Sequence, residues 1–237
     1  MPASGHSCCF GYVQTYDTKP KRRLFEVLAS QGMQANQQVT FLTDGGEDIR
    51  ELPRYLNPQA EHLLDWFHIT MRITVMTQLA KGMCSSSPEL SATLTAQLQR
   101  LKWFLWHGNV FRSLQIVDDL TTDLEDEDGQ PDKDRRDKLA KAVREFGGCL
   151  AANASAIPNY GERDRAGEVI STSFVESAVN QVISKRMVKK QQMRWSPRGA
   201  HLLLQIRTRV LNDALAQDYR RWYPDFTHVP ERQEQAA

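Results

Sequence analysis

Two aspartates each end an apolar run in the first third of the chain. Asp44 lies in the stretch FLTDGGEDI, and Asp65 lies in the stretch HLLDWFHIT. In open α/β sheets, functional side chains gather just outside the carboxyl ends of the strands. Carboxylate oxygens at such an edge suit Mg²⁺, a hard cation that prefers oxygen ligands. The pattern therefore indicates a divalent-cation site. The alternative is structural, with Asp44 in an Asp-Gly turn and Asp65 capping the following helix.

A third carboxylate candidate is Glu176, in the stretch FVESAVNQVISKRMVKK. Helical spacing puts Glu176 at the edge of an apolar stripe, from which it can face the sheet instead of solvent. The alternative is an ordinary solvated glutamate. Together with two aspartates it suits two-metal phosphoryl transfer, in which one ion activates the attacking oxygen and the other stabilises the leaving oxygen. The expected substrate is a phosphodiester.

The surrounding pattern predicts the elements that position these residues. Runs typical of strands alternate with helical patterns, in the order 9–16 (strand), 20–32 (helix), 37–43 (strand), 47–56 (helix), 61–66 (strand) and 67–82 (helix). Such alternation predicts a largely parallel α/β sheet. From about residue 88 the strand-like runs end, so an all-helical insertion is expected, followed by helices that include one beginning near Pro197.

Four segments of the chain closely resemble the bacterial insertion-sequence transposases of the ISKra type. They are VQTYDTKPKRRLFEVL, VTFLTDGGEDIREL, EHLLDWFHITMRI and FVESAVNQVISKRMVKKQQMRW. These transposases belong to the DDE class and have an RNase H-like core. The resemblance implies an α/β, RNase H-like fold that is incomplete at its N-terminus and carries a large all-helical insertion. The expected parts are 9–82 (first part of the core), 83–168 (insertion), 169–222 (helices with the glutamate) and 223–237 (tail).

The same resemblance assigns roles to the candidate residues. It makes Asp44 the second acidic residue of the catalytic triad and Glu176 the final glutamate, both binding Mg²⁺ or Mn²⁺. It matches Asp65 and His68 to an accessory Asp-x-x-His element near the scissile phosphate or the flanking DNA. The implied reaction is hydrolysis at the transposon end, followed by attack of the freed 3′-hydroxyl on target DNA.

The chain departs from the family pattern in one respect. The first catalytic aspartate should precede Asp44 on an earlier strand, and the single aspartate in that part of the sequence is Asp17, which matches an ordinary strand end. The sequence therefore predicts an N-terminally truncated copy that does not complete cleavage alone. Two alternatives remain: a non-catalytic DNA- or transposase-binding protein that interferes with transposition, and a nuclease with a rearranged ligand set that uses Asp17.

The charge distribution and two tryptophans indicate a DNA surface. Residues 185–221 carry ten basic and two acidic side chains, whereas 118–137 carry ten acidic and three basic ones. Cations beside a carboxylate site suit phosphate contacts, although they can also form a solvated helix face. Trp103 and Trp106 can stack on an unpaired base or can belong to the core. The cations expected to bind DNA are Lys185, Arg186, Lys189, Lys190, Arg194 and Arg198.

Composition favours a cytoplasmic protein without a membrane segment. The sequence lacks an uninterrupted apolar run of about 18 residues and a basic, apolar leader. Its four cysteines are irregularly spaced, which fits reduced thiols better than a disulfide framework. The expected partners are DNA and either a second copy of the chain or a full-length transposase.

Overall fold

The computed structural model describes residues 8–13, 15–49, 51–124, 132–173, 175, 179, 182–183 and 194–225. The chain divides into two compact units. Residues 34–174 form one, which we call the sheet-and-bundle unit. Residues 1–33 and 175–237 form the other, which we call the terminal unit.

The sheet-and-bundle unit contains a two-stranded parallel sheet. Strand β1 (Thr40–Thr43) pairs with β2 (Glu61–Leu64), and Thr43 lies opposite Leu64. The connection between the strands holds the 3-10 helix η1 (Glu47–Ile49) and the short helix α2 (Leu52–Leu56). Two of the three predicted strands and their parallel direction are thereby confirmed. The fold is mixed α/β and mostly helical.

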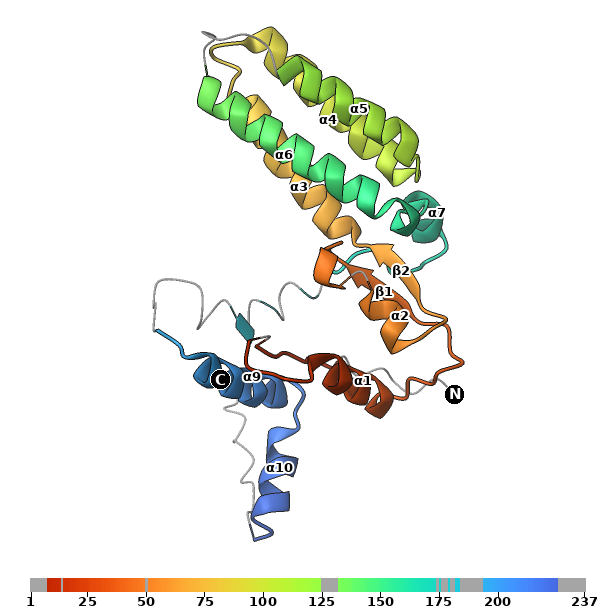
Figure 1. Cartoon of the computed structure of the whole chain (residues 1–237), viewed down its shortest axis with the longest axis vertical. Coiled ribbons are helices and arrows are strands. Elements are labelled where there is room, and N and C mark those ends of the chain that lie inside the picture. Colours follow the sequence, from red (N-terminus) through yellow and green to blue (C-terminus); the bar gives the residue numbers. More distant parts are fainter. Residues whose placement is uncertain are drawn as a thin grey trace, which may run out of the picture. The chain divides into compact units, whose positions relative to one another are not determined.

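Four long helices pack against one another beside this sheet (Figure 1). They are α3 (Trp66–Lys81), α4 (Pro88–Trp106), α5 (Val110–Leu124) and α6 (Lys133–Ala152). Each packs on the next along the chain, and α6 also packs on α3, which closes the arrangement. Shorter helices follow, η2 (Ala154–Ala156) and α7 (Tyr160–Arg165). As predicted, the described elements after β2 in this unit are all helical.

Leucines at three- and four-residue spacing build the core of the bundle. On α4, a stripe of four leucines is fully enclosed: Leu94, Leu98, Leu101 and Leu105. Such spacing places apolar side chains on one face of a helix, and burial of that face supplies most of the stability of a surface helix. The facing helices complete the core with Leu120, Leu139, Val143 and Phe146.

The described part of the terminal unit includes an extended segment and the helices α1, α9 and α10. Helix α1 (Pro20–Ser30) was predicted, whereas the single helix expected after Pro197 is divided into α9 (Pro197–Leu211) and α10 (Leu215–Trp222). The division falls at Asp213, whose φ of 52° is left-handed and interrupts a right-handed helix.

The first predicted strand is wrong for the described part of residues 9–16, which forms no strand. Side chains of α9 and of Asn212 directly after it, instead of a neighbouring strand, bind the backbone of this extended segment. Asn212 accepts from the Cys9 amide at 2.7 Å and donates to the Cys9 carbonyl at 2.8 Å. Gln205 donates to the Gly11 carbonyl at 2.7 Å.

Membrane-spanning character is not found in the described helices. None of them combines the length and the apolar composition needed to cross a bilayer.

Candidate active site

The two strand-end aspartates occupy equivalent positions in the sheet. The Asp65 amide donates to the Thr43 carbonyl at 2.8 Å, so each aspartate directly follows one of two paired, parallel strands. This confirms the prediction that Asp44 and Asp65 stand at the carboxyl ends of neighbouring strands. Their side chains nevertheless have very different surroundings.

Asp44 has an exposed side chain at the mouth of a cavity. Its Oδ1 accepts from the Gly46 amide at 3.0 Å, which is the Asp-Gly turn of the structural alternative. Among the described residues, Oδ2 has no hydrogen-bond partner. The carboxylate therefore shapes its own loop through one oxygen and keeps the other available to a ligand.

The cavity beside Asp44 has a volume of about 470 Å³. It lies between the loop after β1 and the helices α3 and α6. Its charged and polar lining comes from Asp44, Glu47, His68, Arg72, Glu145 and Cys149. Both signs of charge are present, so the cavity suits a cation and an anionic group bound together.

A glycine and a buried asparagine hold the loop against α6. Gly45 has a φ of 79°, and a Cβ there would lie 2.6 Å from Leu64 Cδ1 and 2.9 Å from Asn153 Nδ2. Asn153 donates to the Gly45 carbonyl at 3.1 Å and to the Cys149 carbonyl at 2.9 Å. Only glycine fits between strand and helix here, and Asn153 fixes the position of the residue next to Asp44.

Asp65 is completely buried, and both of its oxygens are engaged. Oδ1 accepts from the Phe67 amide at 3.1 Å and from the Thr172 amide at 2.9 Å, and Oδ2 accepts from the Thr172 hydroxyl. The bond to Phe67 caps α3, as the structural alternative stated. A carboxylate with these partners has little remaining capacity to bind a cation.

His68 and Arg72 line the cavity one helical turn apart on α3. His68 is half exposed, and its Nε2 lies 3.7 Å from Asp65 Oδ2. Arg72 has no hydrogen-bond or ion-pair partner among the described residues. Arg72 was not singled out from the sequence, although its spacing of four from His68 places both on one helix face.

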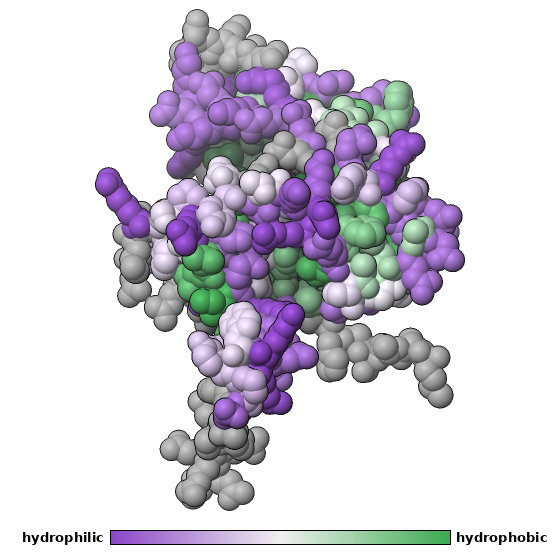
Figure 2. Space-filling view, turned by 60° about the horizontal axis from the view of Figure 1, so that its bottom comes forward, coloured by the Kyte–Doolittle hydropathy of each residue, from purple (hydrophilic) through white to green (hydrophobic). Residues whose placement is uncertain are grey.

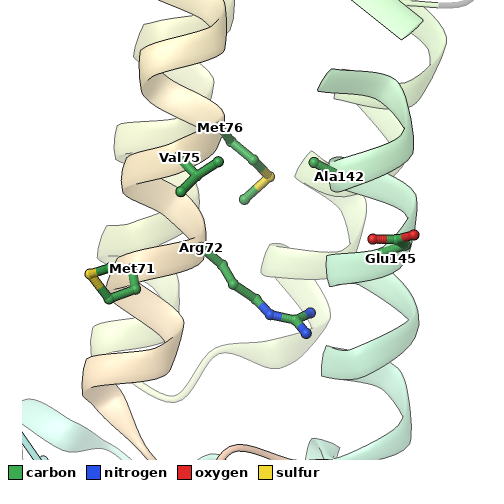
Figure 3. A pocket seen from close by; sticks show the side chains of 6 residues that line it. All are labelled: Met71, Arg72, Val75, Met76, Ala142 and Glu145. Atoms are coloured by element: carbon green, nitrogen blue, oxygen red, sulfur yellow. The ribbon is translucent and has the colours of Figure 1, made fainter. Parts of the chain in front are cut away.

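Arg72 also borders a second, smaller hollow of about 270 Å³ between α3 and α6. The Arg72 side chain extends from α3 toward α6, the helix that carries Glu145 (Figure 3). Met71 and Val75 lie on either side of Arg72 on α3 and also line this hollow. Glu145 forms an ion pair with Lys141 at 3.9 Å. An unpaired guanidinium between two helices is well suited to an oxyanion such as a phosphate group.

The described donor side chains do not by themselves form a complete divalent-cation site. Within the described ranges, no three His, Cys, Asp or Glu side chains gather closely enough to hold a metal ion. Asp44 offers a suitable carboxylate oxygen, whereas Asp65 does not. Glu176, the other predicted metal ligand, lies outside the described residues.

The two candidate tryptophans differ in environment. Trp103 is 58% exposed, with its ring 4.4 Å from that of His107. Trp106 packs on the core, where its ring lies 5.0 Å from that of Trp66. A Cβ on Gly161 would lie only 2.5 Å from Trp106 Nε1. Of the two rings, that of Trp103 is exposed enough to stack on a base, whereas that of Trp106 belongs to the core.

The hydroxyl of Tyr160 joins the core to the sheet. It donates to the Leu64 carbonyl at 2.6 Å, directly before Asp65. Burial raises the pKa of Tyr160, and the negative charge of Asp65 raises it further, so the hydroxyl keeps its proton. The carbonyl at the end of β2 is thus held by a hydroxyl that stays protonated and continues to donate.

Two of the predicted DNA-contacting cations can be located. Arg194 and Arg198 are exposed beside the start of α9, which Ser196 caps by accepting from the Gly199 amide at 3.1 Å. The remaining four, Lys185, Arg186, Lys189 and Lys190, lie outside the described residues.

Comparisons with known proteins found no similarity: no family model and no curated protein matches the sequence, and no solved structure matches the fold.

Proposed function

We propose that this chain acts on DNA in the cytoplasm as a transposase-like protein of the DDE class, with an RNase H-like core. One observation carries the proposal. Asp44 directly follows a strand that is paired in parallel with β2, and its carboxylate lines an open cavity that also contains His68 and Arg72. In α/β sheets this edge is where ligands bind.

Each residue has a role in the proposed reaction. Asp44, with Glu176, binds Mg²⁺ or Mn²⁺, which when bound neutralises charge at the phosphodiester under attack. His68 and Arg72 contact phosphate oxygens from the opposite wall of the cavity. Arg194 and Arg198 contact the DNA backbone, and Trp103 stacks on an unpaired base. The reaction is hydrolysis at a DNA end followed by strand transfer.

The proposal is tested by cleavage of labelled duplexes that cover the DNA flanking the coding sequence, with Mg²⁺ or Mn²⁺. The variants are Asp44→Asn and Glu176→Gln, and the matched control is Asp164→Asn on the exposed surface of α7. Any metal-dependent cleavage that the wild-type chain shows should fall at least about 100-fold in both site variants, because each removes a negatively charged ligand. Equal cleavage by Asp44→Asn and the control would refute the role of Asp44.

A second candidate function is non-catalytic binding of DNA or of a full-length transposase, which would interfere with transposition. It is favoured by the burial of Asp65, which leaves a single strand-end carboxylate facing the cavity. Salt-dependent DNA binding without cleavage by the wild-type chain would support this function. Assembly with a second copy or with a full-length transposase is measured in the same samples by light scattering.

A further inference from the structure

The carboxylate of Asp65 joins three separate parts of the sheet-and-bundle unit. It follows β2, it caps α3 through Phe67, and it binds both the amide and the hydroxyl of Thr172. Thr172 is 107 residues further along the chain. A second bond acts beside it, since the Trp66 amide donates to the Ile170 carbonyl at 3.1 Å. Residues 170–172 are therefore attached to the carboxyl end of β2.

This attachment precedes the proposed catalytic glutamate in the sequence. Glu176 is four residues after Thr172. A buried carboxylate that accepts three hydrogen bonds is a strong anchor, because charge-assisted bonds are stronger than neutral ones.

We propose that Asp65 is a positioning residue that anchors Thr172, and with it residues 170–172, at the carboxyl end of β2. The inference rests on the proposed function for the effect of Asp65 on DNA cleavage, whereas the anchoring itself does not depend on it. Asp65 acts through Thr172 and His68 and does not bind a cation. Of the two strand-end aspartates, Asp44 alone lines the cavity.

The chemistry of asparagine separates an anchor from a metal ligand. In Asp65→Asn, Oδ1 still accepts from the Phe67 and Thr172 amides. The new Nδ2 donates to the Thr172 hydroxyl, whereas in the wild type this hydroxyl donates to Asp65 Oδ2. Asparagine thus preserves the anchor and removes the charge. Alanine removes both, and Thr172→Val removes the hydroxyl bond alone while keeping the shape of the side chain.

The experiment is hydrogen exchange of the Thr172 amide in the full chain, with DNA cleavage measured on the same samples. We expect exchange to accelerate roughly tenfold or more in Asp65→Ala, less in Thr172→Val, and by under about threefold in Asp65→Asn. In cleavage, Asp65→Asn is expected to stay within about tenfold of wild type while Asp44→Asn falls at least about 100-fold.

Two results would overturn the inference. One is unchanged exchange of the Thr172 amide in Asp65→Ala, or in Thr172→Val if the alanine variant does not fold. The other is a loss of cleavage in Asp65→Asn as large as that in Asp44→Asn, with exchange as in wild type. If the wild-type chain binds DNA without cleaving it, the non-catalytic function replaces the enzymatic one, and exchange at Thr172 still decides whether Asp65 anchors residues 170–172.

Discussion

In the bundle of the sheet-and-bundle unit, leucines on α4 are fully enclosed, whereas apolar residues with similar spacing on α9 of the terminal unit are half exposed. Leu98 has no exposed surface, while Leu202, Ile206 and Val210 are 49%, 53% and 55% exposed. Apolar side chains of this kind reach the molecular surface between polar ones (Figure 2). An amphipathic stripe therefore predicts a helix face but not how deeply that face is buried.

The two units also differ in what holds their irregular segments. In the terminal unit, residues 9–13 are bound by Gln205 and His201 of α9 and by Asn212 directly after it. The His201 Nδ1 accepts from the Val13 amide at 3.3 Å. In the sheet-and-bundle unit, a closed apolar core is present as well, and polar side chains such as Asn153 and Asp65 bind the segments at the strand ends. Substitutions of matched chemistry in the two units should separate these contributions.

The largest effect is expected from matched leucine substitutions. Leu98→Ala should lower the free energy of unfolding by about 3 kcal/mol, because it leaves a cavity in a closed core. Leu202→Ala should change it by less than about 0.5 kcal/mol, since its side chain is half in solvent. Urea denaturation followed by helical circular dichroism measures both, and equal effects would contradict the contrast between α4 and α9.

The next effect concerns the two tryptophans within α4. Trp106→Ala should destabilise the fold by about 2 to 3 kcal/mol, because the ring packs on Trp66 and the core. Trp103→Ala should leave stability nearly unchanged and weaken binding of single-stranded DNA by about 1 to 3 kcal/mol. Thermal unfolding and fluorescence anisotropy test the pair, and unaltered DNA binding by Trp103→Ala would exclude stacking.

A smaller effect is expected in the terminal unit. Asn212→Ala removes both bonds to Cys9 and should cost about 1 to 2 kcal/mol locally. Faster hydrogen exchange of residues 9–13 would report it, with exposed Gln217→Ala on α10 as the control. Unchanged exchange in this segment would mean that packing, and not the asparagine, holds it.

The smallest effect depends on pH. Hydrogen bonding to Arg163 lowers the pKa of Glu61 below its ordinary value of 4.5, against the opposing effect of burial. A lowered folded-state pKa contributes stability above pH 4.5 that is lost as pH falls below that value. The loss should stay under about 1 kcal/mol, because the pair is partly exposed. Arg163→Gln should flatten this part of a stability-versus-pH curve, and an unchanged slope would exclude the pair as its source.

Much of the local structure follows from the sequence, because its signals are local. The Asp-Gly turn after β1, the cap at Asp65 and the apolar spacing on α4 each lie within a few residues of the element they predict. The segment 9–13 was predicted to be a strand since its residues favour extended backbone. Its hydrogen bonds come from side chains about 190 to 200 residues away, which local propensity does not contain.

The candidate site was only partly predictable for the same reason. Asp44 and Asp65 were found from their positions after strands, and His68 from the family resemblance. Asp65 differs from Asp44 because Thr172 binds its carboxylate, and Glu145 and Cys149 of α6 complete the lining of the cavity beside Asp44. These partners meet only after the chain has folded, so the sequence indicated the candidate carboxylates without indicating which of them is buried.

The contact between Gly161 and Trp106 has a consequence for how the chain can evolve. Position 161 accepts no side chain while a tryptophan occupies 106, because even a Cβ would overlap the indole nitrogen. A library randomised at 161 alone should return glycine. Randomising 106 as well should admit larger residues at 161 when a smaller one replaces the tryptophan, so the two positions are expected to change together.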